Sequence, residues 1–142
     1  MRQFIILLIL SISFSGCGQE PEIVTFKIDE NIYETSIGNA FEIKKDDISF
    51  SVKRINESAK KRYEFMSKTL DFMDDFSKEY ISEIDAYLIS GTKTFGEDKT
   101  YLYHFFKNVN GKQGISILVI CPFDEDQKYK VEIFRVVQST HF

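Results

Sequence analysis

The sequence has few of the residues that carry covalent, redox or metal chemistry. It contains two cysteines, two histidines and no tryptophan in 142 residues. His104 and His141 are 37 positions apart, and although they could meet on neighbouring strands, nothing marks a further ligand or a nucleophile beside them. We expect His104, which lies among aromatic residues, to be a hydrogen-bonded sheet residue. The sequence therefore predicts no metal, no cofactor and no catalytic residues.

The excess of either charge is also small. Lys and Arg number 18 and Asp and Glu number 22, which gives a net charge of −4. A mildly acidic chain has no reason to seek nucleic acid or an anionic membrane surface. The N-terminal apolar run, Phe4 to Phe14, has about 11 residues, whereas a membrane-spanning helix needs roughly 20. The sequence therefore predicts neither a nucleic-acid partner nor a transmembrane helix.

The motifs of phosphate, calcium and hydrolase sites are incomplete. The segment Gly91–Gly96 begins like a phosphate loop, but Glu97 stands where that loop needs lysine and would repel phosphate. The segment Asp124–Lys128 begins like a calcium loop, but a lysine stands at its fifth position and the glycine of the sharp turn is missing. No Gly-x-Ser-x-Gly or His-Glu-x-x-His motif is present. We therefore expect a protein that is not an enzyme, with a hydrolase built from His104 and a distant carboxylate as a minor alternative.

The N-terminal segment has the layout of a secretory signal. Residues 1–3 carry a positive charge, residues 4–14 are nearly all apolar, and Ser15 and Gly16 are small. A charged start, a short apolar run and small residues before a cleavage site are the parts of a signal that is removed from the mature protein. The sequence therefore predicts a signal peptide over residues 1–16.

The residues Phe14-Ser15-Gly16-Cys17 resemble the lipobox of bacterial lipoproteins, with Phe14 where leucine is commonest. The resemblance implies cleavage between Gly16 and Cys17 and attachment of acyl chains, palmitate among them, to Cys17. It also implies a protein held on a membrane of the cell envelope through its N-terminal lipid. Aspartate after the cysteine usually retains such proteins at the inner membrane, and here that residue is Gly18. The resemblance therefore favours the outer membrane, facing the periplasm.

Cleavage at Cys17 has consequences for the rest of the chain. Removing 16 of 142 residues leaves 126, with 17 basic and 22 acidic residues and a net charge of −5, a length that fits one domain. Residues 17–22 form a lipidated tether, whose five residues after the cysteine reach at most about 17 Å, and residues 23–142 form a single domain. With Cys17 acylated, Cys121 has no disulfide partner, and we expect it to be a small buried residue.

Most of the domain has the pattern of β strands. Apolar residues alternate with polar ones over 24–28 and 48–52, and the segment 100–107 is rich in aromatic residues. The pair Asn110-Gly111 favours a tight turn, after which residues 114–121 form a continuous apolar strand that Pro122 ends. We expect the last two strands to pair with each other in an antiparallel sheet.

Two segments have helical spacing. Apolar residues recur at intervals of three and four from Ala59 to Tyr80, which predicts one long helix over about 57–80. The tail fits both periods, but the acidic residues from Asp124 favour a helix over about 125–138, followed by a short strand at 140–142. The predicted fold class is α+β, an antiparallel sheet with both helices packed on it.

The strand at 100–107 has two apolar faces. Tyr101, Tyr103 and Phe105 share one of them. Either a helix covers this face, or its tyrosines form an interface, since tyrosine combines a large contact area with a polar tip. The three residues are therefore a possible interface with another protein.

Most of the chain is similar to the PsbP-like fold, which includes DcrB-type envelope lipoproteins and Eag-type chaperones. The similarity lies in the order of the elements, including the helix predicted over about 57–80. It also lies in the aromatic strand, the Asn110-Gly111 turn, the apolar strand ending at Cys121-Pro122 and the acidic start of the final helix. It implies a non-catalytic binding or accessory role and transfers no site residues. We expect an envelope lipoprotein that binds another protein, with an immunity protein against a periplasmic toxin and a small-ligand carrier with an apolar cavity as alternatives.

Overall fold

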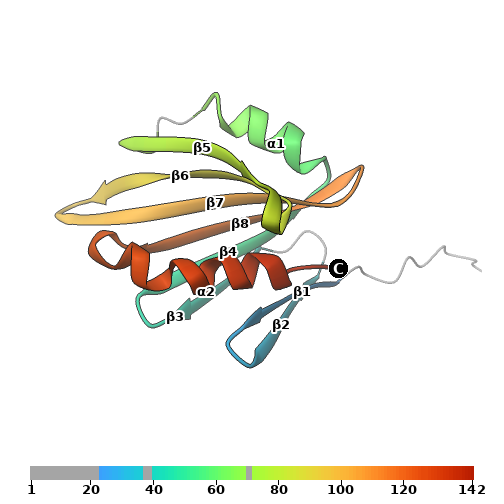
Figure 1. Ribbon diagram of the computed structural model, residues 1–142, viewed down its shortest axis with the longest axis horizontal. Coiled ribbons are helices and arrows are strands. Elements are labelled where there is room, and N and C mark those ends of the chain that lie inside the picture. Colours follow the sequence, from blue (N-terminus) through green and yellow to red (C-terminus); the bar gives the residue numbers. More distant parts are fainter. Residues whose placement is uncertain (1–22, 37–39, 70–71) are drawn as a thin grey trace, which may run out of the picture.

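The structure is a computed structural model that describes residues 23–36, 40–69 and 72–142. These residues form eight β strands, two α helices and two short 3-10 helices (Figure 1). Every strand pairing among them is antiparallel. The predicted α+β class with an antiparallel sheet is therefore confirmed. The predicted signal peptide and tether, including Cys17, lie outside the described residues.

Six strands form one sheet in the order β3-β4-β8-β7-β6-β5. Their bounds are β3 Ala40–Lys45, β4 Ile48–Ile55, β5 Asp75–Ile81, β6 Ala86–Phe95, β7 Asp98–Asn110 and β8 Gln113–Pro122. The central strands β7 and β8 are joined through the predicted Asn110-Gly111 turn. The predicted pairing of the aromatic strand with the apolar strand is therefore confirmed.

The first two strands form a separate hairpin, β1 (Ile23–Ile28) and β2 (Asn31–Ser36). The predicted alternation over 24–28 is confirmed, because Val24, Phe26 and Ile28 are buried while the residues between them are at least partly exposed. The hairpin packs beside the final helix on one face of the six-stranded sheet (Figure 1). It therefore extends the cover that the helix provides.

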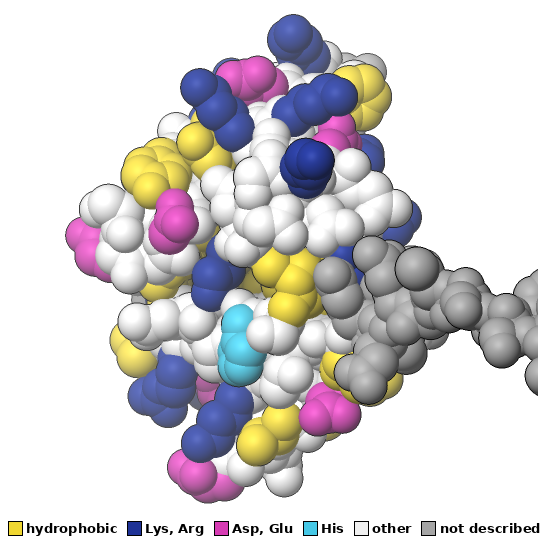
Figure 2. All heavy atoms as spheres, turned by 90° about the vertical axis from the view of Figure 1, so that its right-hand side faces the viewer, with side chains coloured by type: hydrophobic (Ala, Val, Ile, Leu, Met, Phe, Trp, Pro, Cys, Tyr) yellow, Lys and Arg dark blue, Asp and Glu magenta, His cyan; other side chains and the backbone are white. Residues whose placement is uncertain are grey.

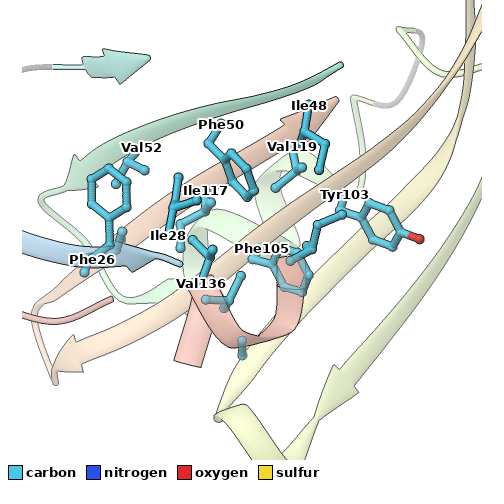
Figure 3. Packing of buried hydrophobic residues seen from close by; sticks show 14 of the residues in the cluster. Phe26, Ile28, Ile48, Phe50, Val52, Tyr103, Phe105, Ile117, Val119 and Val136 are labelled. Atoms are coloured by element: carbon cyan, nitrogen blue, oxygen red, sulfur yellow. The ribbon is translucent and has the colours of Figure 1, made fainter. Parts of the chain in front are cut away.

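Helix α2 (Asp126–Ser139) confirms the predicted helix over 125–138 and covers the same face. It buries Tyr129, Ile133, Val136 and Val137, which recur at intervals of one, three and four residues. Figure 3 shows side chains from the hairpin, the sheet and the helix directed into one core. Apolar area removed from water stabilises a fold by roughly 25 cal/mol per Å², so this layer is the main source of stability.

The predicted long helix over 57–80 is wrong beyond its first two turns. Helix α1 spans only Ala59–Met66, and the chain returns as strand β5 at the edge of the sheet. The helical interpretation places Tyr80 in one apolar row and Phe76 in a second row beside it, each at intervals of three and four residues along most of its length. A spacing of four also equals two strand repeats, and with Lys78 these residues lie on one face of β5.

The acidic residues of this segment favour the observed structure. In a helix over 57–80, Asp74 and Asp75 would lie near the negative end of the helix dipole. In the structure Asp74 follows the helix, and its carboxylate accepts hydrogen bonds from the backbone N–H of Thr94 at 2.9 Å and from Nζ of Lys93 at 3.3 Å. These bonds, the Thr94 bond first, hold the pKa of Asp74 below its usual value. The carboxylate thus joins the start of β5 to β6.

Strand β6 continues through Gly91, where the sequence suggested an interruption. A Cβ atom at Gly91 would lie 1.9 Å from the carbonyl oxygen of Asp75 and 2.8 Å from the Cα of Phe76. The glycine therefore allows the backbone of β5 to cross close to β6. The phosphate-loop hypothesis fails here on structure as well as sequence, because Gly91–Phe95 is extended strand.

The predicted strand over 140–142 is reduced to one bridge between the two ends of the described fold. The N–H of Thr25 donates to the carbonyl of His141 at 2.6 Å, and the N–H of His141 donates to the carbonyl of Thr25 at 2.8 Å. The C-terminus therefore lies beside the start of β1 (Figure 1).

Candidate protein-binding edge

The structure places the three predicted interface residues mainly in the core. Tyr103 is 3% exposed and Phe105 is 0% exposed, and only Tyr101 is partly accessible. Helix α2 covers this face of β7, with the ring of Phe134 5.6 Å from that of Phe105 in an edge-to-face arrangement. Tyr103 and Phe105 therefore do not form an interface. For these two residues the alternative prediction, that a helix covers this face of the strand, is confirmed.

Cys121 is a buried residue of β8, as predicted. Burial, together with the charges of Asp126 and Glu125, raises the pKa of its thiol to about 11. A thiol with so high a pKa is almost entirely protonated at neutral pH, and the thiolate is the reactive form. We therefore expect Cys121 to react slowly with oxidants and alkylating reagents in the folded protein.

His104 is the hydrogen-bonded sheet residue that the sequence predicts. Its Nε2 and the Oγ of Ser116 on the neighbouring strand β8 lie 2.7 Å apart. Its ring contacts that of Phe106 at 4.3 Å, and no described residue reaches its buried Nδ1. Burial, with a smaller effect from the charge of Arg62, lowers the pKa of His104 to about 4.

This Ser116–His104 pair lacks the rest of a catalytic site. A serine nucleophile needs a base oriented by a third group, and a carboxylate commonly fills that position. Here the charge that acts on His104 is the cation of Arg62. The pair is better explained as a hydrogen bond that satisfies two polar groups beneath α1.

The described part of the chain also lacks the elements of two other site types. It contains no group of three His, Cys, Asp or Glu side chains placed to hold a metal ion. Of the helices in that same part, none has the length and apolar character needed to cross a membrane.

One accessible apolar surface of the sheet is its edge at β5. Every residue of Asp75–Tyr80 is exposed, and among the described residues no strand pairs with the outer side of β5. Phe76 is 45% exposed and Tyr80 is 52% exposed. An unpaired edge offers a row of free N–H and C=O groups to an added strand. Sequence reasoning missed this edge because it assigned the segment to a helix.

Helix α1 packs over β6, β7 and β8 and borders this edge across a groove. A groove of about 280 Å³ between the two elements is lined by Tyr63, Glu64, Ser67, Lys68 and Lys78. Phe65 on the same helix is 58% exposed. We refer to the outer side of β5 together with this groove as the β5 edge surface.

Aromatic stacking gives the β5 edge surface a fixed shape. The ring of Tyr87 on β6 lies 5.0 Å from the ring of Tyr63 on α1 and 4.9 Å from the ring of Tyr80 on β5. The hydroxyl of Tyr80 donates to Oδ1 of Asp85 at 2.8 Å, and this bond raises the pKa of Tyr80. Aromatic pairs at such distances stabilise by about 0.5–1.5 kcal/mol beyond area burial. These contacts therefore hold α1, β5 and β6 together in the free protein, before any partner binds.

Comparisons with known proteins support the fold. No protein-family model matches the chain, and no curated protein matches it. A solved structure with a similar fold is the crystal structure of LpqN, which is described as involved in cell envelope biogenesis of Mycobacterium tuberculosis. The TM-score is 0.53 at 8% sequence identity, over 87% of this chain and 86% of LpqN. At that identity the likeness shows the fold alone, and the PsbP-like assignment stays a prediction.

Proposed function

We propose that this chain is a lipid-anchored accessory protein of the cell envelope that is not an enzyme and binds another protein through the β5 edge surface. The lipobox-like residues ending at Cys17 support the anchor. The fold shared with LpqN, a protein involved in cell envelope biogenesis, is in keeping with the location. The observation that carries the proposal is the exposed strand β5, with Phe76 and Tyr80 on an unpaired edge.

The charges of β5 favour a different protein over a second copy of this chain. In a two-fold antiparallel pairing of two β5 strands, the residue at the symmetry axis opposes itself. Centring the pair on Lys78 places two lysines opposite each other, and centring it on Glu79 places two glutamates there. Centring it on Ser77 instead brings Asp75 opposite Glu79. Like charges directly opposite destabilise a strand pair. Centring the pair on Phe76 or Tyr80 avoids them but overlaps only three residues of each β5 strand. A partner strand of another sequence therefore fits this edge better.

The interior gives no support to the small-ligand alternative. Buried side chains of the hairpin, the sheet and α2 fill the space between these layers (Figure 3). A pocket of about 590 Å³ lies at the surface and is lined by Asp47, Glu97, Asp98 and Lys99 among others. A carrier of apolar molecules needs a mostly apolar cavity. An immunity protein is one form of the proposed protein-binding role, and a toxin gene beside this one would support it.

Site-specific crosslinking tests the binding surface. A photoreactive residue replaces Lys78 in the full-length chain, and the matched control places it at Val131, which is 70% exposed on α2. We expect one discrete adduct from position 78 in native envelopes, and loss of most of that adduct when Phe76→Asp and Tyr80→Asp are added. Equal adducts at both positions, or an adduct unaffected by the two aspartates, would contradict the proposal.

Substitution of the cysteine tests the anchor separately. Cys17→Ala removes the only thiol that the resemblance to a lipobox assigns to acylation. We expect the variant to lose labelling by radioactive palmitate and to leave the membrane fraction, whereas Cys121→Ala should keep both properties because Cys121 is buried. Unchanged membrane fractionation of Cys17→Ala would refute the lipid anchor.

A further inference from the structure

The two faces of strand β5 carry different chemistry. Glu79 lies opposite Leu88 of β6, which belongs to the core under α2. Side chains alternate along a strand, so every second residue from Asp75 to Ile81 faces the side of the sheet that α2 covers. The residues between them face the side of α1: Phe76, Lys78 and Tyr80.

On the α2 side, a serine stands between two carboxylates. Residues two positions apart on a strand are about 7 Å from each other, so Asp75 and Glu79 flank Ser77 within the reach of one long side chain. Both carboxylates belong to exposed residues, and neither has an ion-pair partner among the described residues. A cationic side chain on an added strand would therefore meet a carboxylate on either diagonal if it lay opposite Ser77.

A small hollow on the same side of β5 can receive such a side chain. Its volume is about 150 Å³, and Asp75, Ser77, Ser90, Thr92 and Tyr101 are among the residues that line it. The hydroxyls of Thr92 and Tyr101 have no hydrogen-bond partner among the described residues. Hydroxyl and carboxylate oxygens accept hydrogen bonds, whereas the charged groups of lysine and arginine only donate them. The lining of the hollow therefore complements a basic side chain.

The charges around the hollow are negative on balance. Tyr103 lies opposite Ser90. Burial raises the pKa of Tyr103, and the charge of Asp126 at the start of α2 raises it further, so a third carboxylate acts on this region. The lysines of the neighbouring elements are engaged elsewhere: Lys93 pairs with Asp74, and Lys99 and Lys130 lie over the rings of Phe123 and Phe134.

The α1 side of β5 has the opposite character. Lys68 and Lys78 line the groove together with Glu64, and Glu64 already lies 4.0 Å from Nζ of Lys60. Neither Lys68 nor Lys78 has an ion-pair partner among the described residues. Figure 2 shows Lys and Arg side chains gathered over the upper part of the molecule, at the level of α1 and β5. An acidic side chain on an added strand therefore fits opposite Lys78.

We propose that the protein bound at the β5 edge surface contributes an extended segment with arginine or lysine opposite Ser77 and, next to it, aspartate or glutamate opposite Lys78. This inference rests on the proposed function and defines the chemistry of its partner. In strand addition the backbone hydrogen bonds supply affinity, and pockets for alternate side chains supply specificity. Here the hollow under Asp75 reads the basic residue, and the groove beside α1 reads the acidic one.

Two peptides of identical composition test this pattern. In Thr-Val-Thr-Glu-Arg-Val-Thr, antiparallel pairing with Asp75–Ile81 sets the glutamate opposite Lys78, the arginine opposite Ser77 and the valines opposite Phe76 and Tyr80. In Thr-Val-Thr-Arg-Glu-Val-Thr the two charges are exchanged, and a shift by one residue to correct them would turn the valines to the other face. Each peptide has blocked ends and a fluorophore. Fluorescence anisotropy follows its binding to the full-length protein in a nonionic detergent at low salt.

We expect the first peptide to bind about tenfold more tightly than the second, the difference that one hydrogen bond to a charged group makes. It should also slow amide exchange in β5. Asp75→Asn together with Glu79→Gln should reduce the preference to about twofold. The matched control is Asp47→Asn together with Glu42→Gln, at and beside β3 on the opposite edge of the sheet. It makes the same change of charge and should keep the preference.

The possible failures have different meanings. Equal affinities, with amide exchange in β5 slowed by both peptides, would contradict the assigned partner chemistry and leave the β5 edge surface as a binding site. A preference that survives Asp75→Asn with Glu79→Gln would overturn the inference in the same way. If neither peptide binds at about 1 mM, or if bound peptide leaves exchange in β5 unchanged, strand addition at β5 is contradicted, and the proposed function with it.

Discussion

Nζ of Lys107, on strand β7, donates a hydrogen bond of 2.9 Å to the backbone carbonyl of Thr140, the residue that ends helix α2. The same ammonium donates to the carbonyls of Val137 at 3.1 Å and Gln138 at 3.0 Å. The last carbonyls of a helix have no partner within it and carry partial negative charge. The sheet thus satisfies the end of the helix that covers it, although burial lowers the pKa of Lys107.

Replacing this lysine should loosen the end of α2. Lys107→Met keeps the aliphatic stem but leaves three carbonyls without their donor, and we expect a loss of about 1–3 kcal/mol in the free energy of unfolding. Urea denaturation followed by circular dichroism measures this. Lys112→Met, in the exposed β7–β8 turn, is the control and should change stability by less than about 0.5 kcal/mol. Equal effects of the two changes would show that the three bonds contribute nothing.

His104 should make stability depend on pH in a defined window. Its pKa is about 4 in the folded protein against 6.5 ordinarily. The unfolded chain therefore binds the proton more readily, so stability is complete above pH 6.5 and falls as the pH is lowered toward 4. A difference of this size amounts to about 3 kcal/mol. In His104→Gln, which can keep the bond to Ser116, the loss between pH 6.5 and 4 should be absent in denaturation curves; a persistent loss would assign it to other groups.

Gly91 should be the glycine least tolerant of a side chain. In Gly91→Ala the new methyl group would lie 1.9 Å from the carbonyl oxygen of Asp75, so β5 must move away from β6. We expect a loss of several kcal/mol, because strain at a close backbone approach is among the causes of large destabilisation. Gly111→Ala, which meets no atom within 4 Å, should be nearly neutral. Thermal melting compares the two, and amide exchange in β5 should rise only in the first.

Two phenylalanines, one buried and one exposed, should differ sharply in the stability that is lost when each is replaced by alanine. Phe105 is fully buried under α2, whereas Phe65 is 58% exposed on α1. Phe105→Ala should cost about 3–5 kcal/mol, the usual range for a buried phenylalanine, and Phe65→Ala less than about 1 kcal/mol. Similar losses of stability in both variants would contradict the assigned burial.

The sequence patterns predicted the observed elements where the spacing of apolar residues, or the residues beside them, favoured a strand over a helix or a helix over a strand. The alternation at 24–28 and 48–52 and the turn at Asn110-Gly111 led to the observed strands, and the acidic cluster from Asp124 resolved the ambiguous tail as helix. The pattern failed between Met66 and Tyr80, where intervals of four satisfy both a helix and a strand. The clash of Asp74 and Asp75 with the dipole of the supposed helix was the local sign of the error.

The candidate site was predictable only in part. Tyr101, Tyr103 and Phe105 share a face by alternation, but alternation does not say whether a helix covers that face, and α2 does. The exposed strand β5 could have been found from Phe76, Lys78 and Tyr80, which alternate with polar residues. Its place at the edge depends on the strand order, which follows from long-range pairing and not from local pattern.

The bridge between Thr25 and His141 joins the first strand to the last turn of the described fold. The core between the hairpin and α2 therefore cannot close until the final helix has arrived, and no shorter piece of the chain can bury Phe26 beneath it. Contacts between such distant positions slow folding, because the whole loop must be ordered before they form. A chain that postpones closure in this way can complete its core only after synthesis has reached its last residues.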